Sequence, residues 1–116
     1  MKFARGDMVT AAFQGDLGKP RPAVIIQADN YIEHHVTLLL CPLSTFLSDA
    51  ADFRPTIEPS ETNGLKERSQ AMADKITHLK KAAIRQVIGH LSEDEMSTLE
   101  LAIINITGLQ QFRPQL

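Results

Sequence analysis

The sequence predicts an α+β fold, in which a small, mainly antiparallel β-barrel is followed by one C-terminal amphipathic helix. Short apolar, β-branched runs recur along most of the chain, and turn signals rich in glycine and proline separate them. The clearest helical spacing comes only near the C-terminal end. Because short turns rather than crossover helices join the expected strands, an antiparallel barrel is favoured over a parallel βαβ sheet.

The first three expected strands have the plainest signals. Residues 7–13 follow a Gly-Asp turn signal and continue as an apolar run. Residues 22–28 are apolar and β-branched, and Pro22 suits a first strand position because a proline cannot donate a ladder hydrogen bond. A glycine-rich turn joins these two strands. Residues 36–42 form the third strand, which Pro42 is expected to end.

The middle of the chain is less regular. A polar connection leads to a short strand at residues 53–57 and then to a turn-rich segment that is expected to project. Residues 69–79 fit two alternatives, a helix by their alanine, methionine and lysine content or an extended segment by their polar interruptions. Residues 86–91 form the last strand, with Gly89 at a bulge or at a close approach of backbones.

The helix has signals at both ends. Ser92 and Glu95 form a capping-box pattern, in which the hydroxyl and the carboxylate satisfy two backbone donors. Gly108 offers a stop, so the cap-to-cap length is about 16 residues. The apolar face is expected to contain Met96, Leu99, Ile103 and Ile106.

Length and composition indicate one compact domain, residues 1–116, of ordinary globular character. The formal net charge of −2 means that any binding of nucleic acid must come from a local basic patch. Cys41 is the one cysteine, and we expect it to be a small buried apolar residue in a reducing compartment. No apolar run is long enough for a signal peptide or a membrane span, so we expect a cytoplasmic protein.

Arg21 is the most unusual candidate for chemistry, because it lies between Pro20 and Pro22 in the stretch GKPRPAVIIQAD. The two prolines restrict the backbone on each side and so orient the guanidinium. A planar, permanently charged group held in this way can clamp a phosphate and stabilise charge that develops on it. The alternative is an arginine that pairs with a nearby carboxylate at a strand start.

Other polar residues are weaker candidates. Ser44 and Thr45 follow an expected buried strand, where they can hold a phosphate or simply bond their own turn. Asp74 beside Lys75 suits a base or a surface ion pair. The histidines lack metal-ligand spacing, so we expect no metal or other cofactor, while a general acid or base among them stays open. They are His34, His35, His78 and His90.

Motifs spread along nearly the whole chain add to these local signals. In order they are RGDMV, GKPRPAVIIQAD, LLLCPLST, NGLKERSQAMADKI and IGHLSEDEM. Together they resemble the PemK/MazF family of toxins from bacterial type II toxin–antitoxin systems. The combination of R-G-D with R-P-x-V-I-I-Q and a following aspartate is the most specific part of this likeness.

The resemblance implies an SH3-like barrel with a C-terminal helix, in a homodimer. It also implies an endoribonuclease that cuts single-stranded mRNA without metal, leaving a 2′,3′-cyclic phosphate and inhibiting translation. A cognate antitoxin protein is the implied partner, and contact with DNA is expected only through that antitoxin. In the family, the part that matches residues 69–79 is mostly extended, which favours the second of the two alternatives above.

The resemblance also implies roles for particular residues. Arg21 matches the catalytic arginine, Ser44 a hydroxyl residue at the end of the third strand, and Asp74 an acidic position that some members use in catalysis. Relatives often carry an arginine at the position of Thr77, so part of the RNA-facing surface is altered here, and the first loop is shorter than in many members. Lys75, Lys80 and Lys81 are candidates to compensate. The expected substrate-binding residues are Lys19, Thr45, Lys75 and Thr77.

Two alternatives to a nuclease remain. One is a non-enzymatic toxin of the same fold that resembles CcdB and poisons DNA gyrase, but those relatives end in Trp-Gly-Ile, whereas this chain has no tryptophan and closes with FRPQL. The other is an inactive SH3-like binding module.

Overall fold

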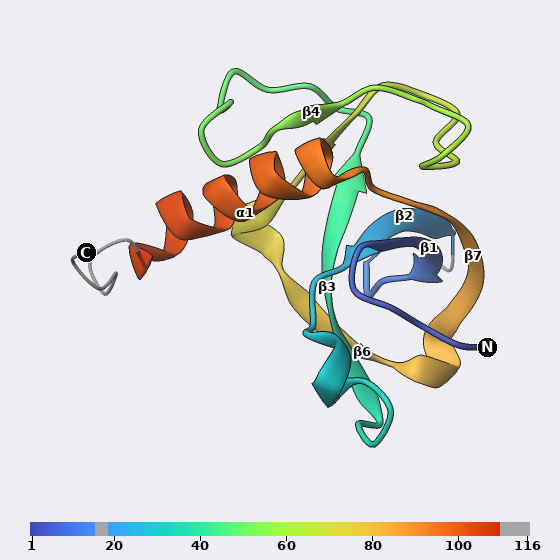
Figure 1. The fold of residues 1–116 in the computed structure, drawn as a ribbon. Coiled ribbons are helices and arrows are strands. Elements are labelled where there is room, and N and C mark those ends of the chain that lie inside the picture. The colour runs from blue at the N-terminus through green and yellow to red at the C-terminus, as the bar shows by residue number, and fades with distance from the viewer. Residues whose placement is uncertain (16–18, 110–116) are drawn as a thin grey trace.

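The structure is a computed structural model that describes residues 1–15 and 19–109. Within these residues, seven strands form a curled antiparallel sheet and one α-helix packs against it, which confirms the expected α+β class (Figure 1). The elements are β1 (Asp7–Ala12), β2 (Pro20–Ile25), 3₁₀ turn η1 (Asp29–Tyr31), β3 (Thr37–Ser44), β4 (Thr56–Ile57), β5 (Ser69–Ala71), 3₁₀ turn η2 (Ala73–Lys75), β6 (Thr77–Lys80), 3₁₀ turn η3 (Lys81–Ala83), β7 (Ile84–His90) and α1 (Glu93–Thr107).

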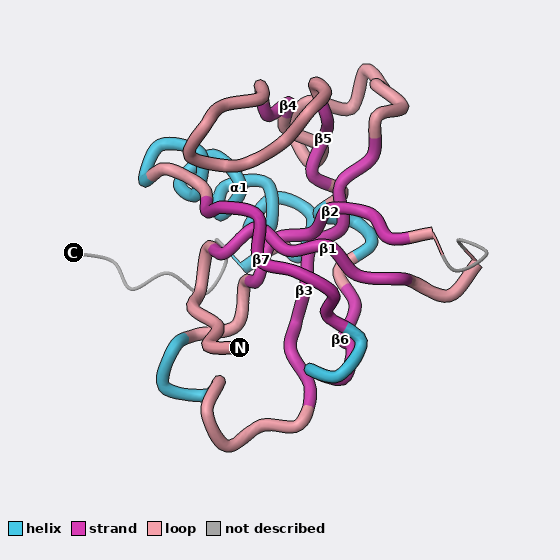
Figure 2. The backbone as a smooth tube through the Cα atoms, turned by 90° about the vertical axis from the view of Figure 1, so that its right-hand side faces the viewer, coloured by secondary structure: helices cyan, strands magenta, loops and turns pink. Residues whose placement is uncertain are grey.

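The strands are ordered β4-β5-β3-β2-β1-β7, and β6 pairs with the first part of β3. Neighbouring strands in this order are antiparallel. The register between β1 and β7 shifts twice, between Met8 and Val9 and between Thr10 and Ala11. Bulges of this kind bend and twist a strand. The sheet therefore curls into a half-barrel, with β4 and β5 standing above the larger part of it (Figure 2).

Both ends of β2 differ from the sequence prediction. β2 begins at Pro20 rather than at residue 22 and ends at Ile25 rather than at residue 28. The early prolines are tolerated because the ladder between β2 and β3 starts only at Ala23. Beyond Ile25, Ile26 N–H still donates a hydrogen bond to the Leu39 carbonyl at 3.1 Å, but the Leu39 N–H donates to the side chain of Gln27, at 3.1 Å from Oε1.

Pro42 does not end β3, so that prediction is wrong. The strand continues to Ser44, and Pro42 lies opposite η2, in the gap between β5 and β6. No ladder partner there requires an N–H from the proline, while its carbonyl accepts a hydrogen bond from Met72 N–H at 2.9 Å. β3 changes partners at this proline, from β6 on one side of it to β5 on the other.

Residues 69–79 are extended, interrupted by η2, as the resemblance implied. Gly89 combines both of its predicted roles. It pairs with Met8 beside a register shift, and a Cβ at this position would lie only 2.3 Å from the carbonyl oxygen of Thr62. The sequence therefore located the last strand correctly, although β7 starts two residues earlier, at Ile84, and ends at His90.

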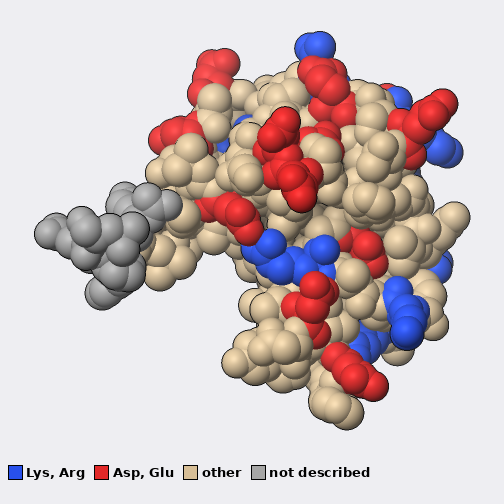
Figure 3. Space-filling view, viewed as in Figure 1, with Lys and Arg blue, Asp and Glu red and all other residues tan. Residues whose placement is uncertain are grey.

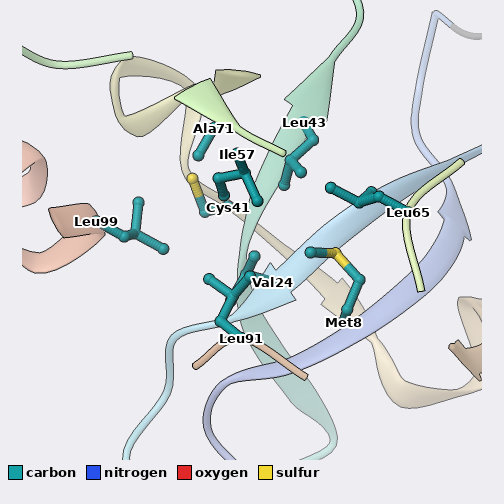
Figure 4. Close-up of a cluster of buried hydrophobic side chains, with 9 residues drawn as sticks. All are labelled: Met8, Val24, Cys41, Leu43, Ile57, Leu65, Ala71, Leu91 and Leu99. Atoms are coloured by element: carbon teal, nitrogen blue, oxygen red, sulfur yellow. The ribbon is translucent and has the colours of Figure 1, made fainter. Parts of the chain in front are cut away.

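Apolar side chains pack on both faces of the sheet, because successive strand residues point in opposite directions. Met8 belongs to one cluster and its neighbour Val9 to the other. Cys41 is fully buried, as predicted. The first cluster contains Met8, Val24, Cys41, Leu43, Ile57, Leu65, Ala71, Leu91 and Leu99 (Figure 4). The second contains Val9, Ala11, Ala23, Ile25, Ile32, Leu38, Leu40 and Ile84.

The caps of α1 are those that the sequence predicts. Ser92 Oγ accepts a hydrogen bond from Glu95 N–H at 3.1 Å, the Glu95 carboxylate accepts one from Ser92 N–H at 2.9 Å, and Gly108 ends the helix at φ +74°. Leu99 and Ala102 are buried, whereas Ile106 is 42% exposed and is not part of the core. The last helical turns extend past the sheet (Figure 1), which explains this error. No helix in the described part of the chain is long and apolar enough to cross a membrane.

Candidate functional site

An open hollow of about 610 Å³ lies beside the strand that carries Arg21. We call it the Arg21 hollow. Four separate parts of the chain form it: the segment after β1, strand β2, strand β3, and the stretch from just before η2 into β6. The described residues that line it are Phe13, Gln14, Arg21, Pro42, Met72, Lys75, Thr77, His78 and Leu79.

The alternation of β2 aims Arg21 at this hollow. Arg21 and Ala23 lie on the same face of the strand, and Ala23 is fully buried in the second apolar cluster. Arg21 continues that face beyond the core and is half-buried opposite Ala11 of β1. Phe13, which packs against the edge of the same cluster, borders the hollow on the β1 side. The guanidinium therefore stands where the core opens to solvent.

The turn η2 and strand β6 supply the opposite wall. A hydrogen bond of 2.9 Å from Lys75 N–H to the Met72 carbonyl closes the turn, and β6 then pairs with β3 so that Thr77 lies opposite Leu40. Lys75 and His78 are exposed, and Thr77 is half-buried. Lys75 and Thr77 thus line the same hollow as Arg21.

Asp74 lies beside the hollow but does not line it. Its two carboxylate oxygens accept hydrogen bonds from Arg54, at 2.9 Å from Nε and 2.8 Å from Nη2. These hydrogen bonds lower the pKa of the Asp74 carboxyl and raise that of Arg54. The ion pair considered for Asp74 therefore exists, but its partner is Arg54 rather than the adjacent Lys75.

Ser44 and Thr45 do not line the Arg21 hollow. The pairing of β2 with β3 stops at Ala23 opposite Pro42, two residues short of Arg21 and Ser44. These two residues therefore stand at neighbouring strand ends on one face of the sheet. Ser44 Oγ accepts a hydrogen bond from Phe46 N–H at 3.1 Å, which is the local turn that the alternative interpretation described. Thr45 borders a separate hollow of about 360 Å³.

The remaining predicted basic residues lie outside the hollow. Lys19 is exposed just before β2, and most of the short first loop that precedes it, residues 16–18, lies outside the described residues. Lys80 is exposed at the end of β6. Lys81 donates hydrogen bonds to the carbonyls of Ile32, at 2.5 Å, and Glu33, at 3.1 Å, so it secures the segment after η1.

Three residues of the hollow were missed or left unassigned at the sequence level. Phe13 and Gln14 had no local signal beyond their place before a glycine turn. His78 was one of four histidines that spacing did not distinguish, and only the pairing of β6 with β3 brings it to the same hollow as Arg21.

The positive charge of the site comes from individual side chains that line it and not from the net charge of the chain. On the face that carries α1, acidic and basic side chains are interspersed (Figure 3), in keeping with the small net charge of −2. Residues 1–15 and 19–109 contain no group of three or more His, Cys, Asp or Glu side chains that could hold a metal ion. The two cations of the hollow, Arg21 and Lys75, are thus its charged features among the described lining residues.

Comparisons with known proteins identify the family of this chain. The profile of the PemK-like, MazF-like toxins of type II toxin–antitoxin systems matches residues 4–107. The chain is 35% identical over 106 residues to a probable endoribonuclease MazF of Mycolicibacterium smegmatis, covering 90% of this chain and 96% of that relative.

Solved structures show the same fold at lower identity. The Mycobacterium tuberculosis toxin MazF-mt6 superposes with a TM-score of 0.76 at 20% identity, covering 88% of this chain and 96% of that one. An endoribonuclease from a mycobacterial species in complex with its cognate antitoxin gives 0.79 at 18% identity, covering 93% and 97%. A MazE–MazF complex from Deinococcus radiodurans gives 0.74 at 19% identity, covering 93% and 97%. With its profile match over most of its length, the chain belongs to the PemK/MazF-like toxin family of type II toxin–antitoxin systems.

Proposed function

We propose that this protein is the toxin of a toxin–antitoxin pair and acts in the cytoplasm as a metal-independent, sequence-specific endoribonuclease on single-stranded mRNA, which inhibits translation. Family membership and the relative named as a probable endoribonuclease support this activity. The observation that carries it is the convergence of Arg21 and Lys75, from distant parts of the chain, on one open hollow. Two cations in such a hollow suit a phosphodiester.

The reaction we assign is an intramolecular transesterification. The 2′ oxygen of a ribose attacks the adjacent phosphorus, the bond to the 5′ oxygen breaks, and the products carry a 2′,3′-cyclic phosphate and a 5′-hydroxyl. Charge builds on the phosphoryl oxygens, and a fixed guanidinium stabilises that charge without a cofactor. Arg21 takes this role, and Lys75 and Thr77 contact the RNA backbone. Ser44, at the strand end next to that of Arg21, positions the phosphate, with Lys19 and Thr45 as flanking contacts.

The form of the hollow supports a single-stranded substrate. Its volume of about 610 Å³ lies within the range of roughly 300–1,000 Å³ usual for ligand clefts. Phe13 borders it, and an aromatic ring can stack on an unpaired base, whereas a base in a duplex is already stacked. We therefore include Phe13 among the base-contacting residues.

The catalytic role that the resemblance implied for Asp74 stays a prediction. Its carboxylate already holds Arg54 through two hydrogen bonds, an arrangement that supports the turn carrying Lys75.

We also propose a homodimer and a cognate antitoxin that covers the RNA-binding surface, with DNA contacted only through the antitoxin. Relatives of the same fold include an endoribonuclease solved with its cognate antitoxin and a MazE–MazF complex. Exposed large apolar side chains of α1 and just beyond it offer area for protein contacts: Leu101 is 56% exposed, Ile106 42% and Leu109 50%.

The test is cleavage of a defined transcript in excess EDTA by the parent protein and by Arg21→Ala. We expect 5′-hydroxyl fragments from the parent and a rate lower by about 10²–10³-fold in the variant, as for the loss of one oxyanion donor. Arg68→Ala is the matched control, because Arg68 is an exposed arginine outside the hollow that pairs with Glu58. Intact RNA with the parent would refute the nuclease, and full activity of Arg21→Ala would refute the assignment of Arg21.

A further inference from the structure

A second hollow, of about 360 Å³, lies against the opposite face of the sheet from the Arg21 hollow. We call it the Gln86 hollow. Gln86 of β7 pairs with Thr10 of β1, Thr10 pairs with Pro22 of β2, and all three line it. Paired residues of neighbouring strands point to one face, and Thr10 shares its face with Met8 of the first apolar cluster, whereas Arg21 continues the face of the second. The strand register and the lining of the hollow therefore agree.

The two hollows flank the same strand ends. On β2, Arg21 borders the first hollow and the next residue, Pro22, borders the second. On β3, Ser44 ends the strand and the next residue, Thr45, borders the second hollow. Among the described residues, no ladder pair joins β2 to β3 beyond Ala23, and the outer ends of β1 and β2 extend away from β4 and β5 (Figure 2). An RNA strand whose phosphate lies between Arg21 and Ser44 therefore has one hollow on each side.

The Gln86 hollow differs from the Arg21 hollow in chemical character. It combines an apolar surface with neutral hydrogen-bonding groups: the apolar side chains are Pro22, Leu65 and Ile88, and the neutral polar ones are Thr10, Thr45 and Gln86. Its charged lining residues among those described, Lys66 and Glu67, have opposite signs. Two cations suit a phosphate, whereas an apolar surface with a few placed donors and acceptors suits a nucleobase.

Residues 64–67, which form one wall of the Gln86 hollow, are fixed by a buried side chain. Asn63 is fully buried, and its amide oxygen accepts hydrogen bonds from the N–H groups of Ser60 and Leu65, both at 3.0 Å. Its amide nitrogen donates a hydrogen bond to the Glu95 carboxylate at 3.1 Å, at the start of α1. A buried polar group with its hydrogen bonds satisfied makes a segment rigid, so this wall is held in place before any ligand binds.

We propose that the Gln86 hollow binds the base of a nucleotide next to the cut and that Gln86 determines which base is accepted. This inference rests on the nuclease function proposed above. The side-chain amide of Gln86 has an acceptor oxygen and two donor hydrogens, so it can form two hydrogen bonds with the edge of one base. An unpaired base has its edges free for such contacts, and the hydroxyl of Thr10 on the neighbouring strand can add a third. The pairing of β7 with β1 carries both residues and so sets their spacing.

The experiment measures how the parent and Gln86→Leu cleave a pool of short RNAs in which the positions on both sides of a mapped cut site are randomised. We expect the parent to favour one base at one of these positions by about 5–150-fold, the discrimination usual for a base held by two hydrogen bonds. In Gln86→Leu this preference should fall to within about threefold, because leucine can form neither bond. The rate on the favoured RNAs should drop, while the rate on the disfavoured RNAs should stay, since those RNAs lack the two bonds already.

Three further variants serve as comparisons. Thr10→Val removes the neighbouring hydroxyl and should weaken the same base preference. Arg21→Ala should slow the cleavage of every RNA in the pool alike, since a phosphate carries no sequence information. His90→Leu is the matched control, because His90 is an exposed polar residue of the same strand outside both hollows, and it should leave rates and preferences unchanged. Because Gln86 and His90 are exposed, their variants should fold, and matching thermal unfolding curves will check this.

The possible failures are distinguishable. If the parent leaves all RNAs intact, the nuclease function fails and the base site fails with it. If the parent cleaves but shows no preference at these positions, or if Gln86→Leu keeps every preference of the parent, the nuclease stands and the Gln86 hollow is not a base site. An equal loss of rate on all RNAs in Gln86→Leu would show a structural residue, which also overturns the proposal.

Discussion

The ion pair between Arg54 and Asp74 joins two segments that are 20 residues apart, and its removal should be measurable. Phe53 and Pro55 accept backbone hydrogen bonds from Ala73 and Ala71, at 3.3 and 3.0 Å, and the charged side chains add two more bonds of 2.9 and 2.8 Å. The side chains of Arg54 and Asp74 are 16% and 25% exposed. We therefore expect a coupling free energy of about 1–2 kcal/mol, between that of an exposed ion pair and that of a buried charged hydrogen bond.

A double-mutant cycle measures this coupling. The variants are Arg54→Met, Asp74→Asn and the combination, each unfolded in urea at pH 7 and at one fixed protein concentration, since association would add to apparent stability. The pH dependence provides a second measurement. Because Arg54 lowers the pKa of Asp74 in the folded state, the contribution is complete above the ordinary carboxyl value of about 4 and is lost as pH falls through the lowered folded value. The difference between parent and Asp74→Asn should therefore shrink below about pH 4.

Two outcomes would refute this account of the pair. A coupling no larger than about 0.5 kcal/mol is within the usual error of additivity and would mean that the pair does not hold the turn. A stability difference that persists unchanged into strong acid would assign it to packing rather than charge. The same variants address catalysis, because a turn that positions Lys75 predicts a higher KM for RNA in Asp74→Asn, whereas a catalytic Asp74 predicts mainly a lower kcat.

Two further predictions concern stability and reactivity. Gly89→Ala should lower the free energy of unfolding by about 1–3 kcal/mol in urea titrations, because its Cβ would lie 2.3 Å from the Thr62 carbonyl oxygen; an unaffected variant would mean that the two backbones are not in close contact. Burial raises the pKa of the Cys41 thiol to about 12, so at pH 8 a disulfide reagent should label it only as the protein unfolds. Immediate labelling of the native protein would contradict the burial of Cys41.

Local sequence signals predicted an element well where the contacts that define its ends lie close together in the sequence. The capping box of α1 involves Ser92 and Glu95, which are three residues apart, and the αL stop at Gly108 requires no distant partner. The apolar face of α1 was predicted less well, since Ile106 has the right spacing but lies beyond the sheet that it was expected to cover. Helical periodicity shows which side of a helix is apolar, and not how far the opposing surface extends.

Pro42 shows a second limit of local reasoning. A proline ends a strand only where a neighbouring strand requires its N–H. Here the neighbouring segment leaves the sheet as η2 at that level, so β3 passes through the proline and gains Leu43 and Ser44. Whether Pro42 ends β3 therefore depends on residues about 30 positions later in the chain, which no window around the proline contains.

The candidate site depends on both local sequence signals and long-range contacts. Arg21 is visible in the sequence because its restriction by Pro20 and Pro22 is local, but a restricted arginine can serve a carboxylate as well as a phosphate. The residues around Arg21 in the hollow come from η2, β6 and the segment after β1, which local sequence signals do not bring together. The pairing of β6 with β3 brings Thr77 to the same hollow as Arg21, and Arg54 holds the carboxylate of Asp74 beside that hollow. The composition of the site thus depends on which long-range pairs form, and no window around Arg21 contains the residues that make them.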